Sequence, residues 1–85
     1  MPQWPEWWTW ELELSAHLLK RMVDRGFTEV DLRLMLENAT GYTQNHEPGR
    51  WIVHTRHALR EWEVILEPLA DENLVVVITA YSLEA

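Results

Sequence analysis

Residues 15–38 read SAHLLKRMVDRGFTEVDLRLMLEN, and this stretch predicts two helices joined by a tight turn. The first helix is expected over about 16–25, with Ser15 as its N-cap residue and Gly26 as the left-handed residue that ends it. Its apolar residues have helical spacing and are Leu18, Leu19, Met22 and Val23. Thr28 to Asp31 resembles a capping box, so the second helix is expected over about 29–38.

The residues before this helical stretch predict a strand. Tryptophan or leucine alternates with a polar residue over 8–14, and a period of two gives a strand one buried face. Trp8 and Trp10 are therefore expected in the core. For Trp4 and Trp7 the sequence leaves two possibilities, because they either fold back on the domain or form an exposed apolar surface.

The residues after the helical stretch predict further strands. A weak strand is expected at about 42–44, and longer strands are expected at 50–56, 61–67 and 74–81. The residues of these strands expected to face the core by alternation are Trp51, Val53, Thr55, Trp62, Val64 and Leu66. The strand at 74–81 is almost wholly apolar, so it is expected to be buried on both faces.

These elements predict an α+β fold in which two helices pack on a mainly antiparallel sheet of four to five strands, in the order β-α-α-β-β-β-β. The length of 85 residues predicts a single domain over 1–85, with a Trp- and Pro-rich extension at 1–7. The chain has no cysteine, which excludes a disulfide, a thiolate metal site and a cysteine nucleophile. No membrane segment or secretory signal is recognised, so the expected location is the cytoplasm. No cofactor is expected, because the glycines are too far apart for a phosphate-binding motif.

The formal net charge is −7, which disfavours non-specific binding to nucleic acid or to an anionic membrane. Six basic residues nevertheless gather in two segments, with Lys20, Arg21 and Arg25 in 15–26 and Arg50, Arg56 and Arg60 in 50–60. If these segments meet in space they form a local anion site. Alternatively, the arginines pair with Glu61, Glu63 and Glu67 across a hairpin.

Two places in the sequence suggest chemistry. His17 lies near the start of the first helix, where the helix dipole disfavours imidazolium, and a neutral histidine can act as a general base. Thr79 and Tyr81 share one face of the last strand and need polar partners or a cleft. Both places also have a purely structural interpretation. His17 can be a helix residue with one structural hydrogen bond, and Tyr81 can be a core tyrosine. No metal site is expected, since His54 and His57 fall on opposite faces of a strand.

Several short segments from Ser15 to Tyr81 carry a resemblance to a known family. They are Ser15-Ala16-His17, Arg21-Met22, Arg25-Gly26-Phe27-Thr28, Asp31-Leu32, Gly49-Arg50-Trp51, Trp62-Glu63-Val64-Ile65 and Val77-Ile78-Thr79-Ala80-Tyr81. Together they resemble domain-of-unknown-function family 4258, which is widespread in bacteria and is grouped with the RelE-like toxins. Those toxins are small α+β proteins, and their members include metal-independent ribonucleases.

The resemblance implies RNA cleavage without a metal. Carried over position by position, it points to His17, Arg21, Arg25 and Tyr81 as catalytic residues. It points to Thr79, and more weakly to Arg50, for substrate binding, and Lys20 is a further candidate because it follows His17 by three residues. In this interpretation His17 takes the proton of a ribose 2′-hydroxyl, arginine stabilises the phosphorane and Tyr81 orients the substrate. The expected partners are RNA or the ribosome, and an antitoxin-like protein.

Two other functions are compatible with the sequence. The first is a non-catalytic interaction domain of the same fold, which binds a partner or a second copy of itself through Trp4, Trp7 or a sheet edge. The second is an enzyme or sensor that holds a small anionic ligand in the arginine cluster. Geometry separates them, because an enzyme requires His17, Arg21 and Tyr81 to converge on an open cleft, whereas a binding module requires exposed tryptophan.

Overall fold

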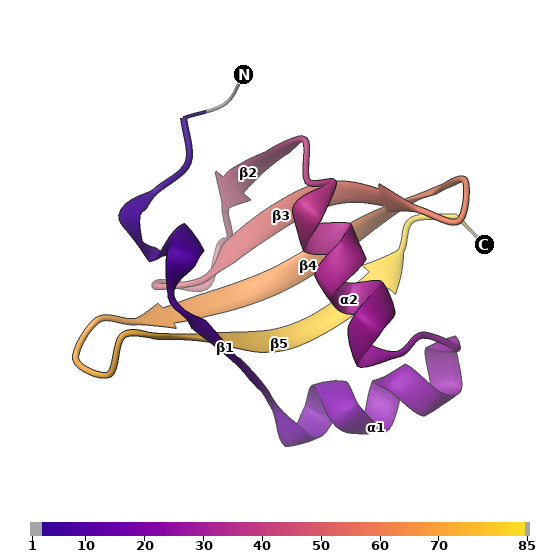
Figure 1. Ribbon diagram of the computed structural model, residues 1–85, viewed down its shortest axis with the longest axis horizontal. Helices are drawn as coiled ribbons and strands as arrows, with labels where there is room; N and C mark the ends of the chain where they lie inside the picture. Colours follow the sequence, from indigo (N-terminus) through magenta and orange to yellow (C-terminus); the bar gives the residue numbers. More distant parts are fainter. Residues whose placement is uncertain (1–2, 85) are drawn as a thin grey trace.

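The structure is a computed structural model that describes residues 3–84 as one sheet with two α-helices (Figure 1). The elements in chain order are the 3₁₀ helix η1 (Glu6–Thr9), β1 (Glu11–Leu14), α1 (Ala16–Arg25), α2 (Glu29–Glu37), β2 (Gly41–Gln44), β3 (Trp51–His57), β4 (Arg60–Leu69) and β5 (Leu74–Ser82). The expected α+β class, the two helices and the upper limit of five strands are confirmed. Within the described residues, no helix has the length and apolarity needed to cross a membrane.

The five strands form one mixed sheet in the order β1-β5-β4-β3-β2. The β2–β3, β3–β4 and β4–β5 pairs are antiparallel, whereas β1 and β5 are parallel. Since Ile65 pairs with Thr79 and Leu66 pairs with Val77, Ile78 is an extra residue that forms a bulge in β5. The first strand of the chain therefore lies beside the last strand.

The helix ends agree with the local signals in the sequence. Ser15 Oγ accepts a hydrogen bond from the Leu18 amide at 3.0 Å, and Gly26 has a left-handed backbone with φ of 68°. Thr28 and Asp31 form the expected capping box, and α2 ends at Glu37, one residue earlier than predicted. Ser15 Oγ also donates to the Ile78 carbonyl at 2.9 Å, which holds the start of α1 against β5.

Both helices pack on one face of the sheet, and this face carries the core. Figure 1 shows α2 lying across the sheet and α1 running alongside β5. The strand residues predicted to face inward, apart from Trp51, are buried, and the hydroxyl of buried Thr55 donates to the Met35 carbonyl of α2. The fully buried side chains of the core are Leu18, Leu32, Met35, Val53, Val64, Leu66, Val75 and Val77.

The expectation that β5 is buried on both faces is wrong. Along β5, buried Val75, Val77 and Ala80 alternate with half-buried residues, with one interruption at the Ile78 bulge. The physical reason is that neither helix covers the second face of the sheet. That face is consequently accessible to a ligand, although Ile65 at its centre is only 6% exposed because its neighbours surround it.

The expected strand over 8–14 is also wrong in its first half. Residues Glu6–Thr9 form η1, in which the Trp8 amide donates to the Pro5 carbonyl, and the strand begins only at Glu11. Tryptophan packing overrides the alternating pattern here. Trp4 stacks on Trp8 with ring centroids 4.3 Å apart and on Tyr42 of β2 at 5.5 Å. The N-terminal segment thus folds back on the domain.

Candidate functional site

Three polar side chains from three adjacent strands form a row on the face of the sheet that the helices leave uncovered. The register pairs His54 of β3 with Glu63 of β4, and Glu63 with Tyr81 of β5. The Tyr81 hydroxyl donates to Glu63 Oε1 at 2.8 Å, and Glu63 Oε2 lies 3.6 Å from His54 Nδ1. His54 Nε2 in turn hydrogen-bonds Thr43 Oγ1 of β2 at 3.0 Å. An acid, an imidazole and a phenol are therefore in contact on an open surface.

Arg25 brings a positive charge to the end of this row. It is the last residue of α1, and its Nη1 donates to Thr79 Oγ1 at 3.0 Å and to the Ala80 carbonyl at 2.9 Å. Because Ser15 anchors the start of α1 to β5, the helix lies along this strand (Figure 1), which brings its last side chain within reach of β5. Within residues 3–84 no carboxylate forms an ion pair with Arg25, so its charge remains available to an anion.

The environment of Tyr81 keeps its hydroxyl protonated. Burial raises the pKa of Tyr81 above its ordinary value, and the hydrogen bond to Glu63 raises it further. The nearby charge of Arg25 acts in the opposite direction and is the smallest of these effects. At neutral pH Tyr81 can donate a hydrogen bond but cannot act as a base. Within the row, Glu63 and His54 are the groups that can move a proton.

The structure brings together only part of the set expected from the sequence. Arg25 of α1 contacts Thr79 of β5, and its charge lies near Tyr81. His17 is exposed on α1 and makes no hydrogen bond or ion pair among the described residues, and Arg21 pairs with Asp24 at 3.1 Å. His17, Arg21 and Arg25 recur every four residues, which places them along one side of the helix. The role of His17 therefore stays a prediction.

The remaining expected binding residues lie outside the row. Arg50 Nε lies 3.0 Å from Glu67 Oε1, in an ion pair between β3 and β4. For this arginine, the expected alternative of a salt bridge across the hairpin is therefore confirmed. Lys20 is exposed on α1 and has no ion-pair partner in the described part of the chain. Neither side chain makes a described contact with Tyr81 or Glu63. Both remain candidates for holding a longer polyanion at the edge of the site.

His54, Glu63 and Thr43 are the residues that sequence reasoning did not assign to the site. The alternation of 61–67 did place Glu63 on the outward face, and that of 50–56 placed His54 on the face opposite Val53. Pairing these two strands as a hairpin would have put both side chains on the same side of the sheet. The missing information was the register of the hairpin.

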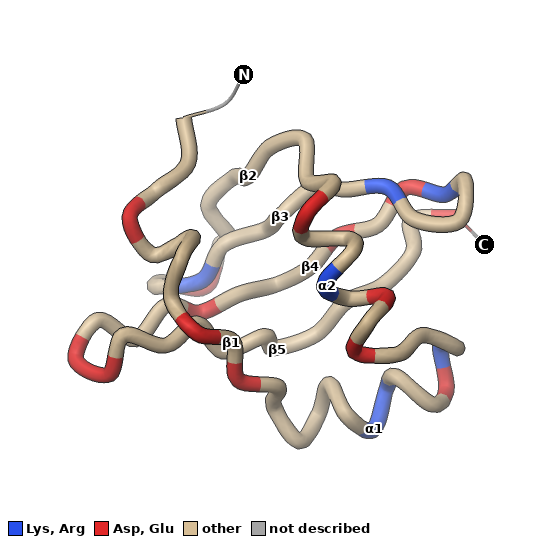
Figure 2. The backbone as a smooth tube through the Cα atoms, viewed as in Figure 1, with Lys and Arg blue, Asp and Glu red and all other residues tan. Residues whose placement is uncertain are grey.

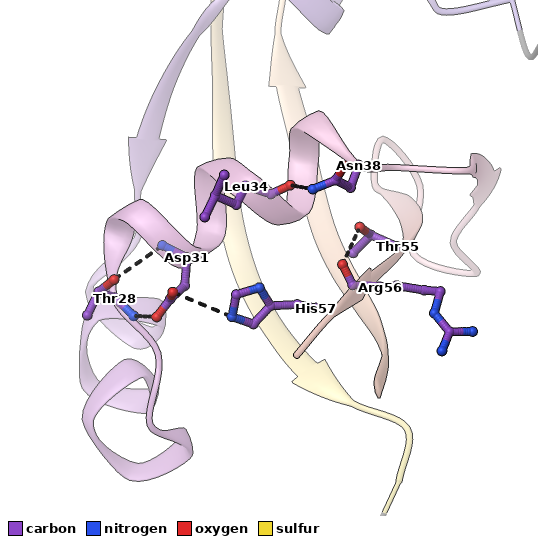
Figure 3. Close-up of polar contacts among 7 residues, drawn as sticks. All are labelled: Thr28, Asp31, Leu34, Asn38, Thr55, Arg56 and His57. Atoms are coloured by element: carbon purple, nitrogen blue, oxygen red, sulfur yellow. Dashed lines mark hydrogen bonds and ion pairs between the residues drawn. The ribbon is translucent and has the colours of Figure 1, made fainter. Parts of the chain in front are cut away.

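The other histidine of β3 has a structural role. His57 Nε2 lies 3.4 Å from Asp31 Oδ1, and the same carboxyl closes the capping box of α2 (Figure 3). This pair sits at the end of the strand and fixes a helix terminus. In the described residues no group of three or more histidine, aspartate and glutamate side chains is arranged to hold a metal ion.

The comparisons with known proteins give one match. The family model described as "Domain of unknown function (DUF4258)" matches residues 14–82. This range contains the whole row, Arg25 and both helices, and it leaves out the tryptophans of the N-terminal segment. No curated protein and no solved structure matches the chain.

Proposed function

The chain belongs to the DUF4258 family, and we propose that it is a metal-independent endoribonuclease whose active site is the row of Tyr81, Glu63 and His54 together with Arg25. The observation that supports this proposal is the contact between a carboxylate and an imidazole on the uncovered face, beside an arginine without a carboxylate partner. Cleavage of RNA at its own 2′-hydroxyl requires a base, an acid and a positive charge, and these residues supply all three.

The proposed reaction uses two proton transfers. Glu63 removes the proton of a ribose 2′-hydroxyl, and the 2′-oxygen attacks the adjacent phosphorus. The bond from phosphorus to the 5′-oxygen then breaks, and His54 in its imidazolium form gives that oxygen a proton. The products are a 2′,3′-cyclic phosphate and a free 5′-hydroxyl, so atoms and charges balance.

Three other side chains stabilise the developing charge or orient the reacting groups. Arg25 uses only Nη1 in its described hydrogen bonds, so Nε and Nη2 can donate to the phosphorane oxygens as negative charge builds. Tyr81 donates to one Glu63 oxygen, which leaves the other oxygen facing His54 and the substrate. Thr43 holds the far nitrogen of His54 and so orients the ring.

The expectations for an enzyme and for its rivals are each met only in part, since His17 and Arg21 make no described contact with Tyr81. A non-catalytic module was expected to expose tryptophan, but all six Trp side chains of the chain are half-buried or buried. A sensor of a small anion requires the arginines to gather, yet Arg25 and Arg50 have different partners and Arg60 lies 3.9 Å from Glu84. The similarity to RelE-like toxins stays part of the proposal, because RNA is expected as the substrate on the basis of that similarity.

The test is cleavage of a labelled RNA pool and of ribosome-bound RNA at low salt with EDTA present, since the net charge of −7 weakens RNA binding. We expect Glu63→Gln to lower the rate by roughly a hundredfold or more. Glu61→Gln is the matched control, because Glu61 lies two residues away on the same face and should leave the rate within about threefold.

The same assay separates the two candidate bases. If His17→Ala abolishes cleavage and Glu63→Gln does not, the proposed RNA cleavage is supported, but Glu63 is not the general base. Wild-type protein that cleaves neither free nor ribosome-bound RNA contradicts the proposed activity. Equal cleavage by the wild type and by Glu63→Gln, His54→Asn and His17→Ala would point to a contaminating nuclease.

A further inference from the structure

A groove of about 630 Å³ lies between the N-terminal segment and α2, on the side of the sheet that carries the helices. Trp7, Trp8 and Trp10 form its wall, and its floor is made by apolar side chains of β1, β4 and β5. It is a different surface from the proposed ribonuclease site, because the row of Tyr81, Glu63 and His54 lies on the opposite face of the sheet. A cavity of this size can accommodate several side chains of a ligand.

The charge around this groove is negative. Glu11 and Glu37 line it, and neither carboxylate forms an ion pair among residues 3–84. Arg33 also lines it, but its charge is neutralised by Glu29, whose Oε2 lies 3.0 Å from Arg33 Nη2. Figure 2 shows acidic residues both along the N-terminal segment and at the end of α2. RNA phosphates are thus repelled from this groove.

Two further features favour a cation. Glu37 is the last residue of α2, and the carbonyl groups at a helix C-terminus add partial negative charge at this point. Trp10 is half-buried against the core and also lines the groove, so part of its indole is accessible from this space. Indole faces beside carboxylates bind ammonium and guanidinium groups by cation–π and ionic attraction.

We propose that this groove binds a basic segment of a protein partner, with a lysine or arginine side chain held between Trp10, Glu11 and Glu37. The groove is larger than a single ammonium group, and its floor is apolar. Both features favour a peptide that has apolar residues between its basic ones. The net charge of −7 attracts such a segment from a distance. The proposal is independent of the ribonuclease activity, because it uses another face and another ligand chemistry.

The test is a titration of the whole protein with a capped peptide in which leucine and arginine alternate. Binding is monitored by tryptophan fluorescence and by the NMR signal of the Trp10 indole. We expect binding by this peptide and none by the same peptide with glutamate in place of arginine. Glu37→Gln should weaken binding roughly three- to thirtyfold. The matched control is Glu72→Gln. It changes the net charge of the protein by the same amount as Glu37→Gln, but it lies in the exposed turn after β4.

Three results would overturn the proposal. They are no binding of the arginine peptide, equal weakening by Glu37→Gln and Glu72→Gln, or an unchanged Trp10 signal at saturation. Equal weakening would mean that the peptide responds only to overall charge. Because Glu37 is exposed, Glu37→Gln should keep the thermal unfolding midpoint, which separates loss of binding from loss of fold. The Glu37→Gln variant should cleave RNA at the same rate as the wild type, so this test is separate from the ribonuclease test.

Discussion

Asp31 of α2 and His57 of β3 are in direct contact, with 3.4 Å between Oδ1 and Nε2 (Figure 3). The other oxygen of the same carboxyl accepts the Thr28 amide at 2.9 Å, so one side chain both caps the helix and joins it to the sheet. The hydroxyl of Thr55 on β3 also donates to the Met35 carbonyl in the backbone of α2. The position of α2 over β3 is therefore fixed by polar contacts at two points.

The first prediction concerns acid stability. The hydrogen bond from the Thr28 amide is the main cause that lowers the pKa of Asp31 below its ordinary value of 3.8. A carboxyl whose pKa is lower in the folded state stabilises the fold above the unfolded-state pKa, and this contribution is lost as pH falls through the folded-state value. Asp31→Asn should therefore be less stable than the wild type at pH 7, and the gap should narrow at low pH.

Urea unfolding at a series of pH values measures this effect. Glu29→Gln is a suitable control, because Glu29 is in the same turn of α2 but takes no part in the capping box. A gap between wild type and Asp31→Asn that stays constant down to the lowest pH would contradict the assignment.

The second prediction concerns alkaline stability. The pKa of Tyr81 is raised above its ordinary value of 10.0, chiefly by burial. A group whose pKa is higher in the folded state stabilises the fold below the unfolded-state pKa and loses that contribution as pH rises through the folded-state value. The wild type should therefore lose stability above about pH 10. This loss should be smaller in Tyr81→Phe and should persist in Tyr42→Phe, as measured by unfolding in urea.

The third prediction concerns the core beneath α1. Leu18 is fully buried, while its neighbour Leu19 is 52% exposed. Leu18→Ala should lower the free energy of unfolding by about 2–5 kcal/mol, because it removes buried apolar surface and leaves a cavity. Leu19→Ala should change it by less than about 1 kcal/mol. Similar losses for the two variants, measured by chemical unfolding, would contradict the placement of α1.

The fourth prediction concerns the turn between β3 and β4. Ala58 and Leu59 have φ values of 52° and 65°, in the left-handed region where residues other than glycine are strained. Leu59 is 90% exposed, so its side chain contributes little packing. Leu59→Gly should raise the stability by about 0.5–1 kcal/mol, whereas Leu59→Val should lower it. A less stable Leu59→Gly in thermal unfolding would contradict this backbone geometry.

The fifth prediction concerns the charge in the proposed active site. Arg25→Lys keeps the charge but cannot present the planar guanidinium that bonds Thr79 and leaves further donors for phosphate. RNA cleavage should fall by roughly tenfold or more. Arg60→Lys is the control, because Arg60 lies in the exposed hairpin, and its rate should stay near that of the wild type. Unchanged cleavage by Arg25→Lys would remove Arg25 from the site.

Helix boundaries could be predicted from the sequence because they depend on contacts within a few residues. Ser15, Gly26 and the capping box of Thr28 with Asp31 each act locally, and all of them occur as expected. The N-terminal alternation predicted a strand where a 3₁₀ helix forms, since the Trp rings gain more by packing against Tyr42 and Trp51 than by joining the sheet. Long-range packing of this kind leaves no periodic signal.

The candidate site could be predicted only in part for a related reason. Thr79 and Tyr81 were predicted as polar groups on an apolar strand and the resemblance added a role for Arg25, but the contact of His54 with Glu63 depends on strand register. Register in a hairpin is set by the turn, and the turn here is Ala58-Leu59, which lacks the asparagine and glycine that mark such turns in sequences. The two catalytic candidates of β3 and β4 therefore became visible only in the folded sheet.

The parallel pairing of β1 with β5 has a consequence for synthesis of the chain. Ser15 bonds Ile78 across 63 positions of sequence, whereas β2 to β5 pair with their immediate neighbours through short connections. On the ribosome, β1 stays without its partner until β5 has emerged, and the closing of so long a loop is slow. The final step of folding, and with it the seating of α1 and Arg25 against β5, is therefore expected to follow translation of nearly all of this domain.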